Sequence, residues 1–250
     1  MSSTRTDSGN AGGSAAKARE SFLIVTCEHG GNRIPGRYGK FFKGKSGLLQ
    51  SHRGWDPGAL VLARKIASYC KAPFAYETVS RLLVEQNRSR NRATVFSEFS
   101  SAFPSDIKER ILRDYYDPYH EKIMEFVNKA ADRDRRAIHV SIHTFTPVLN
   151  GETRNACLGI LYDPSRTCEM LFALQLRNNL HELIPSCKVR RNYPYKGMSD
   201  GVAAWLRKKF TPDCYCGIEI EVNQKHFYGR DRIWNALLSR MPKIIASMIR

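Results

Sequence analysis

Two histidines stand at the ends of apolar runs, where strands are expected to end. His29 follows the run Ser21–Cys27, and His143 follows the alternating run Ala137–Ile142. Imidazole nitrogens are common zinc ligands, and a catalytic zinc ion takes three protein ligands and leaves its fourth position open for water. A histidine at a strand end can equally be a hydrogen-bonding residue of a turn or of the core. Spacing alone leaves both interpretations open.

Three acidic residues are candidates to complete such a site. Asp56 precedes the helix expected over residues 57–72, so it is either a ligand or only the cap of that helix. Glu219 and Glu221 lie in the expected strand Tyr215–Val222 and share one of its faces, because side chains alternate along a strand. A carboxylate there can serve as general base toward a zinc-activated water and then as acid toward the leaving amine. It can also simply pair with one of the many arginines.

Strand-like and helix-like segments alternate along the chain. Short apolar or alternating runs predict strands over residues 21–27, 74–79, 82–84, 137–142, 157–161, 187–190 and 215–222. Helical spacing predicts helices over residues 57–72, 105–131, 168–183, 201–209 and 231–249, with a kink or break at Pro118. This alternation is typical of an α/β sandwich with a mixed, largely parallel sheet. In such sheets the functional residues gather at the carboxyl ends of the strands.

Length and composition predict one globular domain over residues 21–250. The chain has 250 residues, 42% of them hydrophobic, which suits a single sizeable core. Residues 1–20 are rich in Ser, Gly, Ala and Thr and are expected to form a disordered tail. No apolar stretch approaches the roughly 20 residues of a membrane-spanning helix, and no signal peptide is apparent. The seven scattered cysteines favour reduced thiols in a cytoplasmic protein.

The formal net charge of +16 favours anionic partners. The positive residues are spread along the chain rather than gathered in one block, and no nucleic-acid-binding module is recognisable. Nucleic acid is therefore not the expected partner, and a solvated basic surface explains most of these charges.

Six segments, in order, resemble the N-formylglutamate amidohydrolase family. They are V-T-C-E-H-G-G-N-R-I-P (25–35), H-R-G-W-D-P-G-A (52–59), S-R-L-L-V-E-Q-N-R-S (80–89), H-V-S-I-H-T-F-T-P (139–147), N-Y-P-Y-K-G (192–197) and I-E-I-E-V-N-Q (218–224). The family is related to the zinc carboxypeptidases and acylases. The resemblance therefore implies a three-layer α/β/α sandwich and one zinc ion per chain.

By this resemblance, His29 and His143 are the first and last zinc ligands, with Asp56 as the acidic ligand between them. Glu28 is a competitor for the acidic position. Glu221 is the implied catalytic carboxylate.

Glu219 is the alternative to Glu221. The implied substrate-binding residues are Asn87, Arg88, Arg90, Asn192 and Tyr195. Arg88 and Arg90 are expected to bind a carboxylate, because an arginine fork matches its two oxygens, and Asn192 and Tyr195 are expected to line the rim of the pocket.

The expected reaction is zinc-dependent hydrolysis of an N-acyl bond on a small anionic amino-acid-like substrate, N-formylglutamate or a relative. The chain has E-Q-N-R (85–88) where members that act in histidine breakdown carry variants such as D-L-N-R, so the substrate stays open. Two alternatives stay open as well. One is a carboxypeptidase or amidase acting on peptides or cell-wall fragments, and the other is a non-catalytic basic protein that binds nucleic acid.

Overall fold

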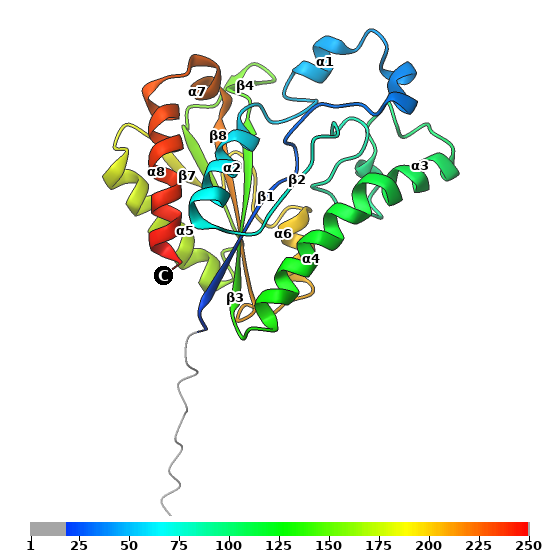
Figure 1. The fold of residues 1–250 in the computed structure, drawn as a ribbon. Coiled ribbons are helices and arrows are strands. Elements are labelled where there is room, and N and C mark those ends of the chain that lie inside the picture. Colours follow the sequence, from blue (N-terminus) through cyan, green and yellow to red (C-terminus); the bar gives the residue numbers. More distant parts are fainter. Residues whose placement is uncertain (1–18, 250) are drawn as a thin grey trace, which may run out of the picture.

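The computed structural model describes residues 19–249 as a twisted sheet with helices on both faces (Figure 1). The predicted N-terminal tail lies, up to residue 18, outside the described residues. The strands of the main sheet are β1 (Ser21–Cys27), β2 (Phe74–Tyr76), β3 (Arg136–Phe145), β6 (Leu158–Leu161), β7 (Val189–Arg191) and β8 (Tyr215–Asn223). A separate small hairpin joins β4 (Val148–Leu149) to β5 (Glu152–Thr153).

The six strands follow the order β2-β1-β3-β8-β6-β7. Strands β2, β1, β3 and β8 run parallel to one another, while β6 pairs antiparallel with β8 and parallel with β7. The predicted mixed, largely parallel sheet is therefore confirmed. The carboxyl ends of β1, β3 and β8 meet at one edge, the upper end of the sheet in Figure 1.

Helices cover both faces of the sheet and form the outer layers of an α/β/α sandwich (Figure 1). On one face lie α2 (Ala59–Cys70), α5 (Thr167–Leu183) and α8 (Arg232–Met248). On the other face lie α4 (Asp117–Ala131) and α6 (Val202–Arg207). Between residues 19 and 249 no helix has both the length and the apolar composition that crossing a membrane requires.

The helix predicted over residues 105–131 consists of three consecutive helical segments. It begins as α3 (Ser105–Ile111), widens into a π-helical turn at Leu112–Tyr116, and continues as α4. Pro118 is the second residue of α4 and has no backbone N–H, so it cannot continue the hydrogen-bond ladder of the helical turn before it. The break therefore falls just before this proline.

The predicted strand over residues 82–84 was wrong. Leu82, Leu83 and Val84 are buried, but their backbone forms turns, and Leu83 N–H bonds the carbonyl of Ser80. Their side chains pack in a third apolar cluster, against the 3-10 helix Gly36–Phe42 and the helical segment that precedes α4. An apolar run of three residues fits such a buried turn as well as a strand.

The remaining elements are the short helices α1 (Ser46–Gln50) and α7 (Gln224–Gly229) and a 3-10 turn at Ala93–Val95.

The two faces of the sheet differ in polarity near the carboxyl ends of the strands. Ile142 of β3 and Ile220 of β8 point into the apolar core below α2, α5 and α8. Their neighbours along each strand point to the opposite face, because side chains alternate. On that face the register pairs Ser141 with Glu219 and His143 with Glu221. The sheet thus brings a buried histidine beside a buried glutamate.

Candidate metal centre and active site

Three side chains from separate parts of the chain converge at this edge of the sheet. His29 lies in the turn after β1, Asp56 precedes α2, and His143 lies near the end of β3. One donor atom of each lies within 4.8 Å of the other two. The Oδ2 atom of Asp56 is 2.9 Å from Nδ1 of His143 and 3.3 Å from Nδ1 of His29. All three residues are buried.

The outer nitrogens of both imidazoles are held by further carboxylates. Nε2 of His29 contacts Oε1 of Glu85, and Nε2 of His143 lies 3.1 Å from Oε2 of Glu28. The hydroxyl of Tyr119 donates to the other oxygen of Glu28, at 2.8 Å. Histidines that bind metals usually donate their second ring nitrogen to a carboxylate in this way, which fixes the ring orientation. Each imidazole is therefore oriented with Nδ1 toward Asp56.

This geometry separates the roles of the two candidate acidic ligands. Asp56 belongs to the converging group and also accepts a hydrogen bond from the backbone N–H of Thr144, at 3.3 Å. Glu28 instead binds the outer side of His143. Its second oxygen is already used by Tyr119, which leaves Glu28 suited to orient a ligand.

The charges of the group balance one another. Burial alone would raise the pKa of Asp56, but His29 and His143 outweigh it and hold that pKa below its usual range. Burial alone would lower the pKa of His143, but Asp56 and Glu28 raise it well above its usual value. The pKa of His29 is likewise raised, against burial and Arg81, by Glu85 and Asp56. When no cation is bound, both imidazoles therefore stay protonated up to a higher pH than a free imidazole does.

These residues fit a divalent cation. Two imidazole nitrogens and one carboxylate oxygen are a ligand set that zinc takes in catalytic sites. Such a cation would carry the positive charge that protons on His29 and His143 otherwise supply to Asp56, Glu28 and Glu85. The His29, Asp56 and His143 group could therefore hold a metal ion.

The group opens into a cavity of about 200 Å³. The cavity is lined by His29, Asp56, Arg81, Asn87, Arg88, His143, Thr144, Leu161, Tyr195, Lys196, Ser199, Asp200, Glu219 and Glu221. Both glutamates of β8 thus share one space with the converging histidines.

Glu221 and Glu219 differ in how their oxygens are satisfied. Oε2 of Glu221 is buried and has no hydrogen-bond partner in residues 19–249. Burial, the largest influence, raises the pKa of Glu221 to about 7. Glu219 also has a raised pKa because of burial, but its Oε2 accepts a hydrogen bond from Nδ2 of Asn87 at 3.4 Å. A buried carboxylate oxygen without a partner is costly, so that of Glu221 is the one poised to accept a proton.

Three of the five residues predicted to bind substrate line the cavity, namely Asn87, Arg88 and Tyr195. Nη1 of Arg88 donates to the backbone oxygens of Asn87 and Asp200, at 2.6 and 3.0 Å. Within the part of the chain that the structure describes, Arg88 forms no salt bridge. Its charge is therefore available to an anionic ligand.

The structure places Arg90 and Asn192 away from the cavity lining. Arg90 forms ion pairs with Asp117 at 2.8 Å and Glu109 at 2.9 Å, which leaves it no free carboxylate-binding fork. The side-chain oxygen of Asn192 accepts from the backbone N–H groups of Tyr162 and Gly197, both at 3.1 Å. Asn192 therefore shapes the loop that carries Tyr195 instead of facing the cavity.

Arg81 and Glu85 are among the residues of the site that were missed from the sequence. Nε of Arg81 donates to Glu85 at 2.8 Å, and its Nη1 lies 3.5 Å from Asp56. Arg81 thus bridges Glu85, which orients His29, and Asp56, the acidic member of the converging group. The available signal was the pair of opposite charges four residues apart around the apolar run Leu82–Val84.

Comparisons with known proteins show the family and the fold of this chain. The family model described as FGase, N-formylglutamate amidohydrolase, matches residues 21–228. The crystal structure of a gene product from Agrobacterium tumefaciens is similar over 93% of this chain and 94% of that one, with 28% identity and a TM-score of 0.75. The N-formylglutamate amidohydrolase from Ralstonia eutropha JMP134 is similar over 94% of this chain and 96% of that one, with 17% identity and a TM-score of 0.69. A search of the curated proteins found no match.

The raised pKa values of the two histidines predict that metal binding is linked to proton release. A group with a raised pKa keeps its proton up to a higher pH, so a cation must displace protons from His29 and His143 near neutral pH. The affinity for zinc should therefore rise from about pH 6 to about pH 8. Titration calorimetry in buffers of different ionisation enthalpy should detect the released protons. The control variant His181→Ala, on the exposed side of α5, should behave like the wild type. A zinc affinity that does not change between about pH 6 and about pH 8, with no proton release, would contradict the assignment of His29 and His143 as ligands.

Proposed function

Because the chain belongs to the N-formylglutamate amidohydrolase family, we propose that it is a metal-dependent hydrolase of the N-acyl bond of a small anionic amino-acid derivative, N-formylglutamate or a relative. The observation that carries the proposal is the convergence of His29, Asp56 and His143 beside the unpartnered carboxylate oxygen of Glu221. A cation, when bound to the three, supplies Lewis-acid polarisation and lowers the pKa of water.

Glu221 is the general base and then the general acid of this proposal. Its pKa near 7 suits both roles, since the carboxylate must accept a proton and later return it at a similar pH. A bound cation would favour the carboxylate form and lower this pKa. Glu221 takes a proton from the attacking water and passes it to the nitrogen of the leaving amine. The products are a small acid, formate in the case of N-formylglutamate, and a free amino acid.

The cationic residues of the cavity orient the substrate. Arg88 and Lys196 line it and offer donors to a substrate carboxylate. Arg81 lies within 3.5 Å of Asp56 and adds positive charge where negative charge develops on the acyl oxygen.

The size of the cavity favours a small substrate over a peptide. Its volume of about 200 Å³ lies below the roughly 300–1,000 Å³ typical of sites for drug-sized ligands. An enzyme acting on peptides or cell-wall fragments would need a longer open groove at this position.

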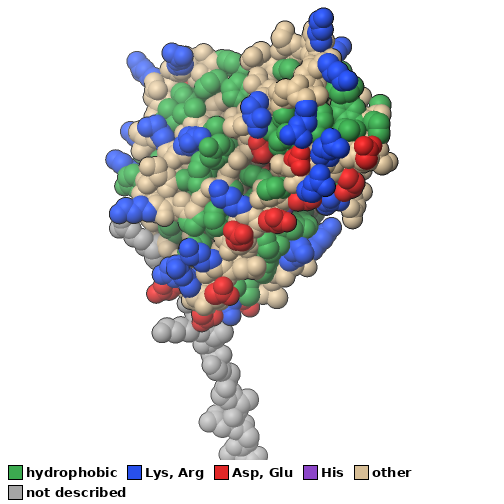
Figure 2. Space-filling view, turned by 45° about the vertical axis from the view of Figure 1, so that its right-hand side comes forward, with side chains coloured by type: hydrophobic (Ala, Val, Ile, Leu, Met, Phe, Trp, Pro, Cys, Tyr) green, Lys and Arg blue, Asp and Glu red, His purple; other side chains and the backbone are tan. Residues whose placement is uncertain are grey.

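On the face drawn in Figure 2, the surface charge does not favour the alternative of a nucleic-acid-binding protein. Figure 2 shows Lys and Arg side chains scattered over one face, with Asp and Glu side chains among them. A single continuous basic stripe would be expected for a phosphate-tracking surface.

Glu221→Gln tests the general base. The amide cannot accept the proton, so kcat for N-formylglutamate, or for the best substrate in a screen of N-acyl amino acids, should fall by about 10²- to 10⁴-fold. Metal content should stay at the wild-type level, because Glu221 is outside the converging group. Glu125→Gln on the exposed side of α4 is the matched control and should keep full activity. Near-normal turnover of Glu221→Gln would remove this residue from the role.

Arg88→Met tests the recognition of the substrate carboxylate. Loss of a charge-assisted hydrogen bond should raise KM by about ten- to a hundredfold. Arg90→Met is the control, since Arg90 pairs with Asp117 and Glu109 away from the cavity. Steady-state kinetics of formate or acid release would measure both. An equal effect of the two variants, or an effect of Arg90→Met alone, would contradict the assignment of Arg88.

A further inference from the structure

Two buried thiols, those of Cys157 and Cys187, lie side by side next to β6 and β7, on the side of the sheet opposite β2. The pairing of β6 with β7 brings Cys157 against the chain entering β7, where Cys157 N–H bonds the carbonyl of Lys188 at 2.9 Å. Its sulfur lies 3.8 Å from the carbonyl oxygen of Ser186. Cys187 lies between Ser186 and Lys188 in the sequence. Cys157 and Cys187 are both buried, and neither is in a disulfide. Neither contributes to the lining of the candidate active site.

A histidine and an aspartate accompany this thiol pair. His226 lies in α7, directly after β8, and its Nδ1 is 2.6 Å from Oδ2 of Asp231. Its Nε2 is buried and, in residues 19–249, has no hydrogen-bond partner. The aspartate fixes the ring as it does for a catalytic histidine, and leaves the other nitrogen free to exchange a proton.

The thiols and the imidazole influence one another's protonation. A hydrogen bond from Cys187, followed by the effect of His226, lowers the pKa of Cys157 below that of an ordinary thiol. The pKa of Cys187 is raised by the same contact and by burial. The pKa of His226 is raised, against burial, by Cys157 and Asp231. The contact with His226 favours Cys157 as the sulfur that gives up its proton, and the thiolate is the form of a cysteine that reacts with oxidants.

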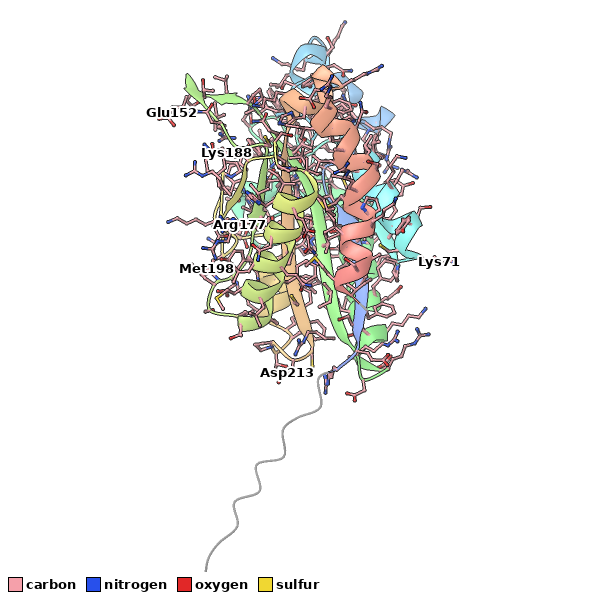
Figure 3. All side chains as sticks on the ribbon, turned by 90° about the vertical axis from the view of Figure 1, so that its left-hand side faces the viewer. Lys71, Glu152, Arg177, Lys188, Met198 and Asp213 are labelled. Carbon is pink, nitrogen blue, oxygen red and sulfur yellow. The ribbon has the colours of Figure 1, made fainter. Side chains whose placement is uncertain are left out.

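A cavity reaches Cys187 of this pair from the surface. Its volume is about 290 Å³, and Ser186 and Cys187 form part of its wall. The cationic side chains of Arg177 and Lys188 line it as well, together with His181. Figure 3 looks onto this face, with Arg177 on α5 and Lys188 on the segment before β7. A small oxidant can therefore reach the wall formed by Cys187 without passing through the active site.

We propose that Cys157 and Cys187 form an oxidation site, at which a hydroperoxide converts the two thiols into a disulfide while His226, held by Asp231, carries the protons. This site is independent of the proposed hydrolase activity. No other part of the described chain joins two neighbouring thiols to a buried imidazole.

The reaction balances in two steps. In the first step, the proton of Cys157 is on His226, and the Cys157 thiolate attacks one oxygen of the peroxide. The S–O bond forms and the O–O bond breaks. The leaving oxygen takes the proton from His226 and departs as water or an alcohol. The Cys187 thiol then passes its proton to His226 and attacks the sulfenic sulfur of Cys157. The S–S bond forms, the S–O bond breaks, and hydroxide leaves as water with that proton. The sulfurs lose two electrons and the peroxide gains them.

A second thiol pair in the same chain is an internal comparison. Cys168 and Cys216 also contact each other, and this contact lowers the pKa of Cys168 to about 7. No imidazole is among the groups that affect this pair. Proximity of two thiols is therefore common to both pairs, and the buried histidine is the difference between them.

Hydrogen peroxide added to the folded, metal-loaded full chain provides the test. After rapid alkylation and proteolysis, mass spectrometry should find the disulfide-linked Cys157–Cys187 peptides, formed faster than any Cys168–Cys216 link. His226→Gln should slow formation by at least about tenfold. Cys187→Ala should stop at a sulfenic acid on Cys157 that dimedone traps. The Cys168→Ala/Cys216→Ala double variant should form the Cys157–Cys187 link at the wild-type rate.

Three results would overturn the proposal. They are the absence of this disulfide in the wild type, an unchanged rate in a His226→Gln variant that melts at the wild-type temperature, and trapping of sulfenic acid on Cys187 instead of Cys157. The wild-type experiment alone decides whether the disulfide forms, so it does not depend on the folding of any variant.

Discussion

The structure around the candidate site depends on the compensation of buried charge. Asp56, Glu28 and Glu85 are all buried at one edge of the sheet, together with His29 and His143. An isolated buried carboxylate is costly, so each must find a positive partner. Here the two imidazoles stand between three carboxylates, and a divalent cation at Nδ1 would complete the neutralisation. The same arrangement that makes burial tolerable also prepares a metal site.

The sheet provides this arrangement through alternation and strand direction. The parallel strands β1, β3 and β8 end together, so His29, His143 and Glu221 meet although they are far apart in the sequence. Alternate residues of β3 and β8 support the apolar core on the opposite face. The helix α2 begins close to the end of β1, and backbone N–H of Asp56 bonds the carbonyl of His29 at 2.9 Å. Core and site are therefore built from the same three strands.

Much of the fold could be predicted from local pattern, and less of the site. Runs such as Ser21–Cys27 and Tyr215–Val222 are apolar enough to identify strands, whereas Leu82–Val84 is equally apolar but packs as a buried turn. His29, Asp56 and His143 were accessible through the resemblance to a family. Arg90 was not distinguishable from Arg88 by sequence, because only the three-dimensional contacts show that Asp117 and Glu109 engage it.

The metal content of the purified protein tests the central claim most directly. Elemental analysis should find about one divalent ion per chain in the wild type and in His52→Ala, a nearby histidine outside the converging group. His29→Ala and His143→Ala should each lose it. An absence of metal from the wild type even after zinc is added back, or full occupancy in both of these variants, would contradict the account.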